Sequence, residues 1–342
     1  AAPVLVQGGT GGTYFLHDAD GERPLAVFKP KDEEVGAPLN PKGYEGRENS
    51  RGWQQRVPSA HRAAREVAAY LLDRDGFAGV PMTTLARGRH PRFAQLRVGD
   101  GAEVVWKVGA FQAFVDTAET ADNFGSGMYS AADVHRVGIL DVRLGNFDRN
   151  HGNMLVHVMR DQIGTRRCRL VPIDHGSSLP DHLDIRRSDV VWMAWPQACE
   201  PFGEEELEYI AELDGRADAR ALAEGLGLER AAQRLLEVTT TWLQAAAAHG
   251  LTLREVGEAL YRDDCANDAP SAVEVAVAAS LDAALTAASA QPRAVPSPQC
   301  GPAPKAGLQR TVTHHSQARD YGSQRGAGLF SRLDGRGRPI EW

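Results

Sequence analysis

The feature that most constrains the fold is a pair of apolar segments at residues 154–158 and 168–172, with polar residues at their outer ends. The turn-forming residues 161–164 lie midway between the two segments. This pattern predicts a β-hairpin. Antiparallel pairing about the midpoint returns the chain to its starting edge, so Asn153 and Asp174 should lie side by side at the open end. The side-chain oxygens of Asn153 and Asp174 would then face the same point.

Asp148 lies in the loop just before the first of these strands, near enough to address the same point. An Asp, an Asn and a second Asp in this arrangement suit phosphoryl transfer. Asp148 would orient the attacking hydroxyl, while Asn153 and Asp174 would hold Mg²⁺ or Mn²⁺ on the phosphates of ATP. The motif therefore predicts an ATP-dependent phosphotransferase with ATP and a divalent metal as cofactors.

At these residues the chain resembles the phosphatidylinositol 3-/4-kinase superfamily, whose catalytic loop has the pattern D-R-x-x-x-N and whose metal motif follows a hairpin. Within that superfamily, residues 134–141, 170–176 and 195–198 resemble the gamma-type (type II-related) phosphatidylinositol 4-kinases of plants and algae. The resemblance runs from about Gly8 to about Tyr261. It implies an α+β, bilobal protein-kinase-like fold, and it implies that Asp148 and Arg149 are catalytic.

A glycine-rich turn near the start of the chain is the candidate phosphate loop, because glycines let the backbone approach phosphate oxygens closely. Taken alone, an ordinary glycine-rich hairpin is the more common explanation. The strand that follows carries Lys29, where a nucleotide kinase needs a cation on the α- and β-phosphates. The resemblance implies the same role for this lysine. The residues expected to contact nucleotide at the turn are Gly9, Thr10, Gly11, Gly12 and Thr13.

Two further segments are candidates for nucleotide binding. A helix predicted over residues 59–73, capped by Ser59, carries Glu66 beside its apolar stripe, and Glu66 is either the partner of Lys29 or a surface residue. Residues 111–115 occupy the place of the hinge between lobes in the family. There the backbone of Gln112, Ala113, Phe114 and Val115 would meet adenine, although a core strand would use the same residues.

The rest of the chain predicts a scaffold and two irregular segments. Helices are expected over residues 130–143, 204–214, 228–249, 252–262 and 271–288, with capping patterns at Ser130, Thr252 and Ser271. Residues 33–58 predict a long mobile loop. We therefore expect a catalytic domain over residues 1–288, with its N-lobe at about 1–110 and its C-lobe at about 115–288. A disordered Pro-, Gly- and Ala-rich tail is expected over residues 289–342.

The composition of the chain limits the classes of partner that it can bind. The net charge of −7 offers no overall field for nucleic acid, and no apolar run is long enough to span a membrane. The four cysteines are scattered and predict no zinc site. We expect a cytoplasmic piece of a longer chain. Its segment 177–196, with Arg186, Arg187 and an apolar edge at residues 190–193, is expected to contact phosphatidylinositol in membranes weakly and reversibly, as a peripheral protein. Solvated arginines, and packing of Trp192, Trp195 and Phe202 in the C-lobe, are the more common roles for such residues.

Three other functions fit parts of the sequence. A Ser/Thr protein kinase of the same fold would use the same motifs on a protein substrate. A pseudokinase scaffold would keep the fold without turnover, although Lys29, Asp148, Asn153 and Asp174 are all present. A metallohydrolase would use a cluster of His and Asp ligands but leaves the glycine turn unexplained. Its candidate ligands are Asp148, His151, Asp174 and His175.

Overall fold

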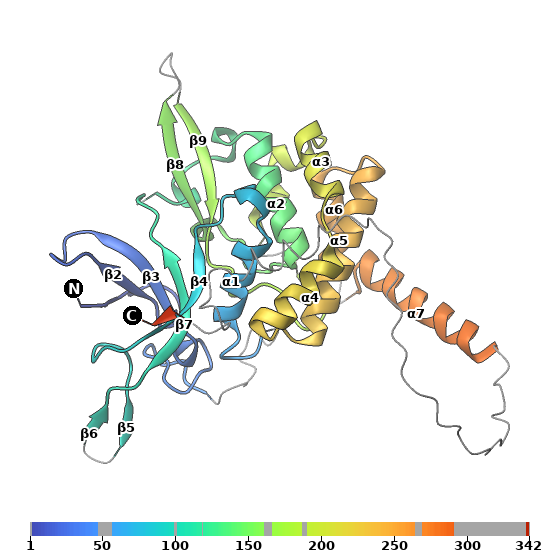
Figure 1. Ribbon diagram of the computed structural model, residues 1–342. Helices are drawn as coiled ribbons and strands as arrows, with labels where there is room; N and C mark the ends of the chain where they lie inside the picture. Colours follow the sequence, from blue (N-terminus) through green and yellow to red (C-terminus); the bar gives the residue numbers. More distant parts are fainter. Residues whose placement is uncertain are drawn as a thin grey trace, which may run out of the picture.

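A β-sheet forms the N-terminal part of the chain and helices form most of the remainder, as the computed structural model shows (Figure 1). The structure describes residues 2–46, 57–98, 101–117, 119–160, 166–186, 190–263, 269–290 and 340–341. The architecture is therefore α+β and bilobal, as the sequence predicts. None of the described helices is both long enough and apolar enough to cross a membrane.

The N-lobe sheet has the strand order β1-β2-β3-β7-β4-β10. Its neighbours pair antiparallel, except that β10 runs parallel to β4. A separate hairpin of two short strands protrudes from this lobe, and helix α1 packs on β4 and β7 (Figure 1). The elements are β1 (Val4–Leu5), β2 (Tyr14–His17), β3 (Pro24–Pro30), α1 (Arg62–Leu72), β4 (Thr83–Gly88), β5 (Leu96–Val98), β6 (Gly101–Glu103), β7 (Lys107–Ala113) and β10 (Ile340–Glu341).

Alternation along β3 separates the core of this lobe from the functional face. Ala26 and Phe28 are buried, and Phe28 belongs to a small cluster with Tyr14 and Phe93. Since successive side chains of a strand point to opposite faces, Lys29 lies on the other side of the sheet. The pairing of Lys29 with Ala110 on β7 fixes that position.

The C-lobe packs around helix α2, which begins at the cap that the sequence predicts: the Ser130 side chain accepts a hydrogen bond from the Asp133 N–H. Helix α6 crosses so close to α2 that a Cβ on Gly138 would lie 2.3 Å from Leu253 Cδ2. Helix α7 extends away from the lobe (Figure 1). The elements are α2 (Ala131–Leu144), β8 (Met154–Arg160), β9 (Arg166–Pro172), α3 (Glu204–Ala211), α4 (Gly215–Leu226), α5 (Arg230–Ala248), α6 (Leu253–Leu260) and α7 (Ala272–Ala290).

Some local predictions are confirmed and others are wrong. Thr252 with Glu255 forms the predicted capping box, and Ser271 with Glu274 exchanges the same pair of hydrogen bonds. The expected cap at Ser59 is wrong, because α1 begins at Arg62 and Glu34 accepts hydrogen bonds from its first N–H groups. Helix α4 was not expected, although Asp214 caps it and Gly227 ends it in the left-handed region.

The segment expected to be a mobile loop is organised where the structure describes it. Glu33, Glu34 and Asn40 are all buried, which contradicts the prediction for residues 33–46. Residues 47–56 lie outside the described residues. Of the expected tail, residues 291–339 and 342 also lie outside them, while Ile340–Glu341 forms β10 beside β4.

Candidate active site

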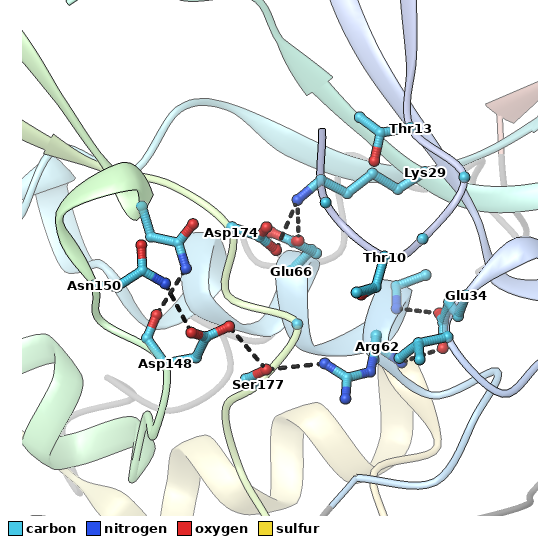
Figure 2. A pocket seen from close by; sticks show the side chains of 17 residues that line it. Thr10, Thr13, Lys29, Glu34, Arg62, Glu66, Asp148, Asn150, Asp174 and Ser177 are labelled. Carbon is cyan, nitrogen blue, oxygen red and sulfur yellow. Dashed lines mark hydrogen bonds and ion pairs between the residues drawn. The ribbon is translucent and has the colours of Figure 1, made fainter. Parts of the chain in front are cut away.

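A cavity of about 340 Å³ lies where the two lobes meet, and its walls carry most of the residues singled out from the sequence (Figure 2). The N-lobe contributes the glycine turn, Lys29 and Glu66, and the C-lobe contributes Asp148, Asn153 and Asp174. Every residue expected at the turn is on the wall: Gly9, Thr10, Gly11, Gly12 and Thr13. Residues more than 100 positions apart in the chain therefore share one polar cavity.

The hairpin of β8 and β9 has the predicted geometry. Met154 pairs with Pro172, and the Ile173 N–H donates to the Asn153 carbonyl at 3.0 Å. This last rung places Asn153 and Asp174 together at the open end. The midpoint argument from the sequence is confirmed, since both residues line the same cavity.

The amide of Asn153 is oriented by Asp148. Its Nδ2 donates to the Asp148 carbonyl oxygen at 2.7 Å, so the amide oxygen is the half that remains available to a metal ion. The carboxylate of Asp148 accepts hydrogen bonds from Asn150 Nδ2 at 2.8 Å and from Ser177 Oγ at 3.5 Å (Figure 2). These contacts fix the loop of residues 148–153 against the cavity wall.

Lys29 lies between two carboxylates. Its Nζ is 2.5 Å from Glu66 Oε1 and 3.1 Å from Asp174 Oδ1 (Figure 2). Burial lowers the pKa of Lys29, but the charges of Asp174 and Glu66 outweigh it, so the pKa is raised. Lys29 in turn holds the pKa of Asp174 well below its usual range. The lysine therefore stays charged, and Asp174 stays ionised.

Backbone conformation also directs Asp174. Its φ of 55° lies in the left-handed region, which is uncommon for a residue other than glycine. The next N–H, that of His175, donates to Glu66 Oε2 at 3.0 Å. Glu66 therefore holds both the lysine and the backbone beside Asp174, and the described geometry places it inside the site rather than on the surface.

The glycine turn is anchored from the segment after β3. Asn40 Nδ2 donates to the carbonyl oxygen of Thr10 at 2.8 Å, and to those of Glu33 and Glu34 at 3.1 Å. The Gly12 N–H donates to the Glu33 carbonyl at 2.8 Å, and a Cβ at Gly12 would lie 2.5 Å from Glu33 Oε2. The close approach explains the glycine at this position.

Arg149 does not line this cavity, which corrects its expected catalytic role. It is fully buried, and its Nε donates to Asp141 Oδ2 at 2.9 Å. Its Nη1 donates to the carbonyl oxygens of Asn153 and Ile173 at 2.5 and 2.8 Å. Arg149 is therefore a positioning residue that ties together the two strands at the open end of the hairpin.

A second cavity, of about 420 Å³, adjoins the predicted hinge. Gln112, Ala113, Phe114 and Val115 all line it, together with the apolar side chains of Phe15, Val27, Leu155 and Ile173. The Gln112 side chain donates to Thr83 Oγ1, and the N–H groups of Ala113 and Phe114 donate to Met82 and Leu25. Those two N–H groups are therefore committed within the N-lobe. Contact with adenine stays a prediction for the other backbone groups of the segment.

Several residues on the cavity wall were not expected from the sequence. Arg62 places a second cation there, and its Nη1 donates to Ser177 Oγ at 2.9 Å (Figure 2). Glu34 and Asn150 also line the cavity. No local pattern marks these residues, because Arg62 and Ser177 meet only through the packing of α1 on the segment after Asp174.

The expected membrane contact of the segment after Asp174 is not supported by burial. Val190, Trp192 and Met193, proposed as an apolar edge, are all buried, and Trp192 Nε1 donates to Asp141 Oδ2 at 3.0 Å. Arg186 forms a β-bridge with Arg262, and Arg187 lies outside the described residues. The prediction of an apolar edge is wrong because these side chains belong to the C-lobe core.

The ligands expected for a metallohydrolase do not converge. His175 is fully buried, and burial followed by the charge of Arg149 lowers its pKa well below the ordinary value. The ring of His151 lies 5.9 Å from that of Trp195. In the described part of the chain, no three His, Cys, Asp or Glu side chains are grouped to hold a metal ion. Asn153 and Asp174 fit a magnesium ion that takes its remaining ligands from phosphate and water.

The family model and the curated relatives that match this chain agree on one family. Residues 9–256 match the family model described as phosphatidylinositol 3- and 4-kinase. Phosphatidylinositol 4-kinase gamma 8 of Arabidopsis thaliana is 42% identical over 281 residues, covering 80% of this chain and 52% of the relative. Phosphatidylinositol 4-kinase gamma 5 of the same plant is 40% identical (80% and 44% covered). Phosphatidylinositol 4-kinase gamma 4 of Oryza sativa subsp. japonica is 37% identical (83% and 49%).

The chain thus spans about half the length of the curated relatives it matches. Two solved kinases share weaker likeness. The Rio2 kinase of Chaetomium thermophilum is 13% identical with a TM-score of 0.38, over 72% of both chains. The proinflammatory kinase CtkA of Helicobacter pylori is 11% identical with a TM-score of 0.34, over 72% of this chain and 93% of CtkA.

Proposed function

Because this chain belongs to the phosphatidylinositol 3- and 4-kinase family, we propose that it transfers the γ-phosphoryl group of ATP to the inositol head group of phosphatidylinositol. The names of the relatives motivate the 4-hydroxyl as acceptor. The observation that supports this proposal best is the meeting of Lys29, Asp148, Asn153 and Asp174 in one cavity under a glycine turn. We propose residues 1–288 as the catalytic unit.

In the proposed reaction each residue has one task. Lys29, held by Glu66, binds the α- and β-phosphates, and the backbone of the glycine turn closes over them. Asp148 orients the acceptor hydroxyl and takes its proton as the new O–P bond forms and the bond from the γ-phosphorus to the β-phosphate oxygen breaks, releasing ADP. Asn153 and Asp174 would hold magnesium or manganese, which would supply positive charge to offset the negative charge that develops during transfer.

The acceptor can be tested directly by supplying the protein with γ-labelled ATP and offering phosphatidylinositol vesicles and a protein acceptor in separate reactions. We expect label in the lipid, at the 4-position of the inositol ring. Label in protein acceptors and never in lipid would leave a kinase but contradict the lipid assignment. Label in neither, with ATP bound normally, would indicate a pseudokinase scaffold.

A further inference from the structure

The N-lobe carries a group of arginine and apolar side chains, which we call the basic–aromatic surface: the half-buried Arg87 and the exposed Arg89, Arg92, Val104 and Trp106. The guanidinium groups of Arg87 and Arg89 lie 4.4 and 5.3 Å from the centroid of the Trp106 ring. Trp106 is 39% exposed and Val104 is 36% exposed. The segments that carry these residues flank the β5–β6 hairpin, which protrudes from the N-lobe (Figure 1).

The charge of this surface is opposite to that of the whole chain. The chain has a net charge of −7, yet residues 76–106, which include the β5–β6 hairpin and the whole surface, contain four arginines against two acidic residues: Arg87, Arg89, Arg92 and Arg97 against Asp100 and Glu103. Burial, followed by the charge of Arg92, lowers the pKa of His90 in the same segment, as expected where positive charges gather. A local positive field therefore exists on an acidic protein.

We propose that the basic–aromatic surface docks the N-lobe onto an anionic lipid bilayer. Arginines attract acidic head groups, and a tryptophan with an aliphatic neighbour is favoured at the boundary between head groups and acyl chains. Nucleic acid fits less well, because Arg87 lies over the Trp106 ring and competes for the face on which a base would stack. The inference rests on the proposed function, since a lipid acceptor requires the enzyme to work at a membrane.

The surface is connected to the glycine turn through Glu33, whose carbonyl oxygen accepts a hydrogen bond from the Gly12 N–H. Phe93, in the middle of the arginine-rich segment, packs on Tyr14 and Phe28 with ring centroids 4.9 and 5.4 Å apart. The Ala94 N–H donates to Glu33 Oε1 at 3.0 Å, and Tyr14 donates to Glu33 Oε2 at 2.6 Å. Docking would therefore hold the glycine-turn end of the cleft near the bilayer that contains the acceptor.

The test uses a double variant that carries both Arg89→Glu and Arg92→Glu. The matched control is a second double variant, with Arg216→Glu and Arg220→Glu, which makes the same charge change at exposed positions of α4. Binding is measured by co-sedimentation with vesicles of phosphatidylcholine alone and of phosphatidylcholine with phosphatidylserine. We expect the first double variant to lose about tenfold or more of its binding to the anionic vesicles, and the control to lose much less. The loss should shrink as salt is raised.

Activity on two forms of the substrate separates this inference from the proposed function. The Arg89→Glu, Arg92→Glu variant should retain activity on short-chain phosphatidylinositol dissolved as monomers and lose it on vesicles. Equal vesicle binding by the variant and the unmodified protein would overturn docking at this surface, as would an equal loss in the α4 control. Loss of oligonucleotide binding with vesicle binding intact would assign the surface to nucleic acid instead. Absence of lipid phosphorylation by every variant, with vesicle binding still lost, would contradict only the proposed function.

Discussion

At the scale of single residues, the site depends on carboxylates that differ sharply in environment. Asp174 is beside Lys29 and stays ionised, because the lysine charge holds its pKa well below the usual range. Glu34 accepts hydrogen bonds from the N–H groups of Arg62 and Ala63 at the start of α1, and it is buried. Burial raises its pKa to about 7, although these two hydrogen bonds lower it. Asp174 is therefore suited to bind a metal ion at neutral pH, whereas Glu34 gains or loses its charge near neutral pH.

The metal role proposed for Asp174 predicts a loss of ATP affinity. Replacing it by alanine removes one of the hard oxygen ligands, so ATP affinity in magnesium should fall by at least about tenfold, toward the value measured with a chelator. Titration calorimetry with a non-hydrolysable ATP analogue measures this directly. Glu208→Ala, an exposed acidic position on α3, is the control. If the unmodified protein binds the ATP analogue equally well with magnesium and with a chelator, the metal role is refuted.

Glu34 predicts a pH dependence of stability. Its folded-state pKa of about 7 exceeds the ordinary value of 4.5, so its stabilising contribution is present below about 4.5 and is lost as pH rises through 7. Glu34→Gln keeps an acceptor for the helix N-terminus but cannot ionise. The unfolding free energy of the unmodified protein, minus that of Glu34→Gln, should fall by up to about 3 kcal/mol from pH 4.5 to pH 8. A difference in unfolding free energy that is constant with pH would contradict the assignment. The control, Glu224→Gln at an exposed position, should show such a constant difference.

At the scale of elements, the segment after β3 couples the nucleotide turn to α1. Asn40 binds the Thr10 carbonyl, its neighbour Glu34 caps α1, and α1 presents Glu66 to Lys29. The same segment carries Glu33, whose carbonyl oxygen receives the Gly12 N–H. The position of this one segment therefore determines the positions of both the glycine turn and the Lys29–Glu66 ion pair.

This coupling predicts that Asn40→Ala acts on nucleotide binding more than on chemistry. The variant removes the side-chain donor to the carbonyl oxygens of Thr10, Glu33 and Glu34, of which the last two keep a backbone donor, at a cost of about 1–3 kcal/mol of stability. Steady-state kinetics should show a several-fold rise in KM for ATP with a smaller change in kcat. Asn123→Ala, which removes only an exposed hydrogen bond to Glu119, should change neither constant. A fall in kcat alone would place Asn40 in the chemical step.

Local sequence patterns were enough for the elements that depend on local contacts. The hairpin follows from its alternation and midpoint, and the caps at Ser130 and Thr252 follow from partners three residues away. The segment around Asn40 was missed because its main partner, Thr10, is 30 residues distant. A motif also cannot tell which of two neighbours faces the cavity: Asp148 does, whereas Arg149 is buried on Asp141. Core packing was the more common role expected for Trp192, and its burial confirms it, whereas the membrane edge predicted for residues 190–193 is wrong.

At the scale of the whole molecule, the active site exists only where the lobes meet. Lys29 and the glycine turn belong to the N-lobe, while Asp148, Asn153 and Asp174 follow α2 and flank the hairpin. The chain spans about half of the relatives it matches, so the activity of the described lobes is the part that can be tested on this protein. In the proposed reaction, that activity depends most directly on Asp148.

The most direct measurement is therefore single-turnover transfer from γ-labelled ATP to phosphatidylinositol vesicles by the unmodified protein and by Asp148→Asn, with ATP affinity measured in parallel. We expect labelled phosphatidylinositol 4-phosphate from the unmodified protein. In Asp148→Asn the rate should fall by about 100-fold or more with ATP affinity nearly unchanged, because the amide cannot accept the hydroxyl proton. Substantial transfer by Asp148→Asn, or no lipid product from the unmodified protein bound to ATP and vesicles, would contradict the account.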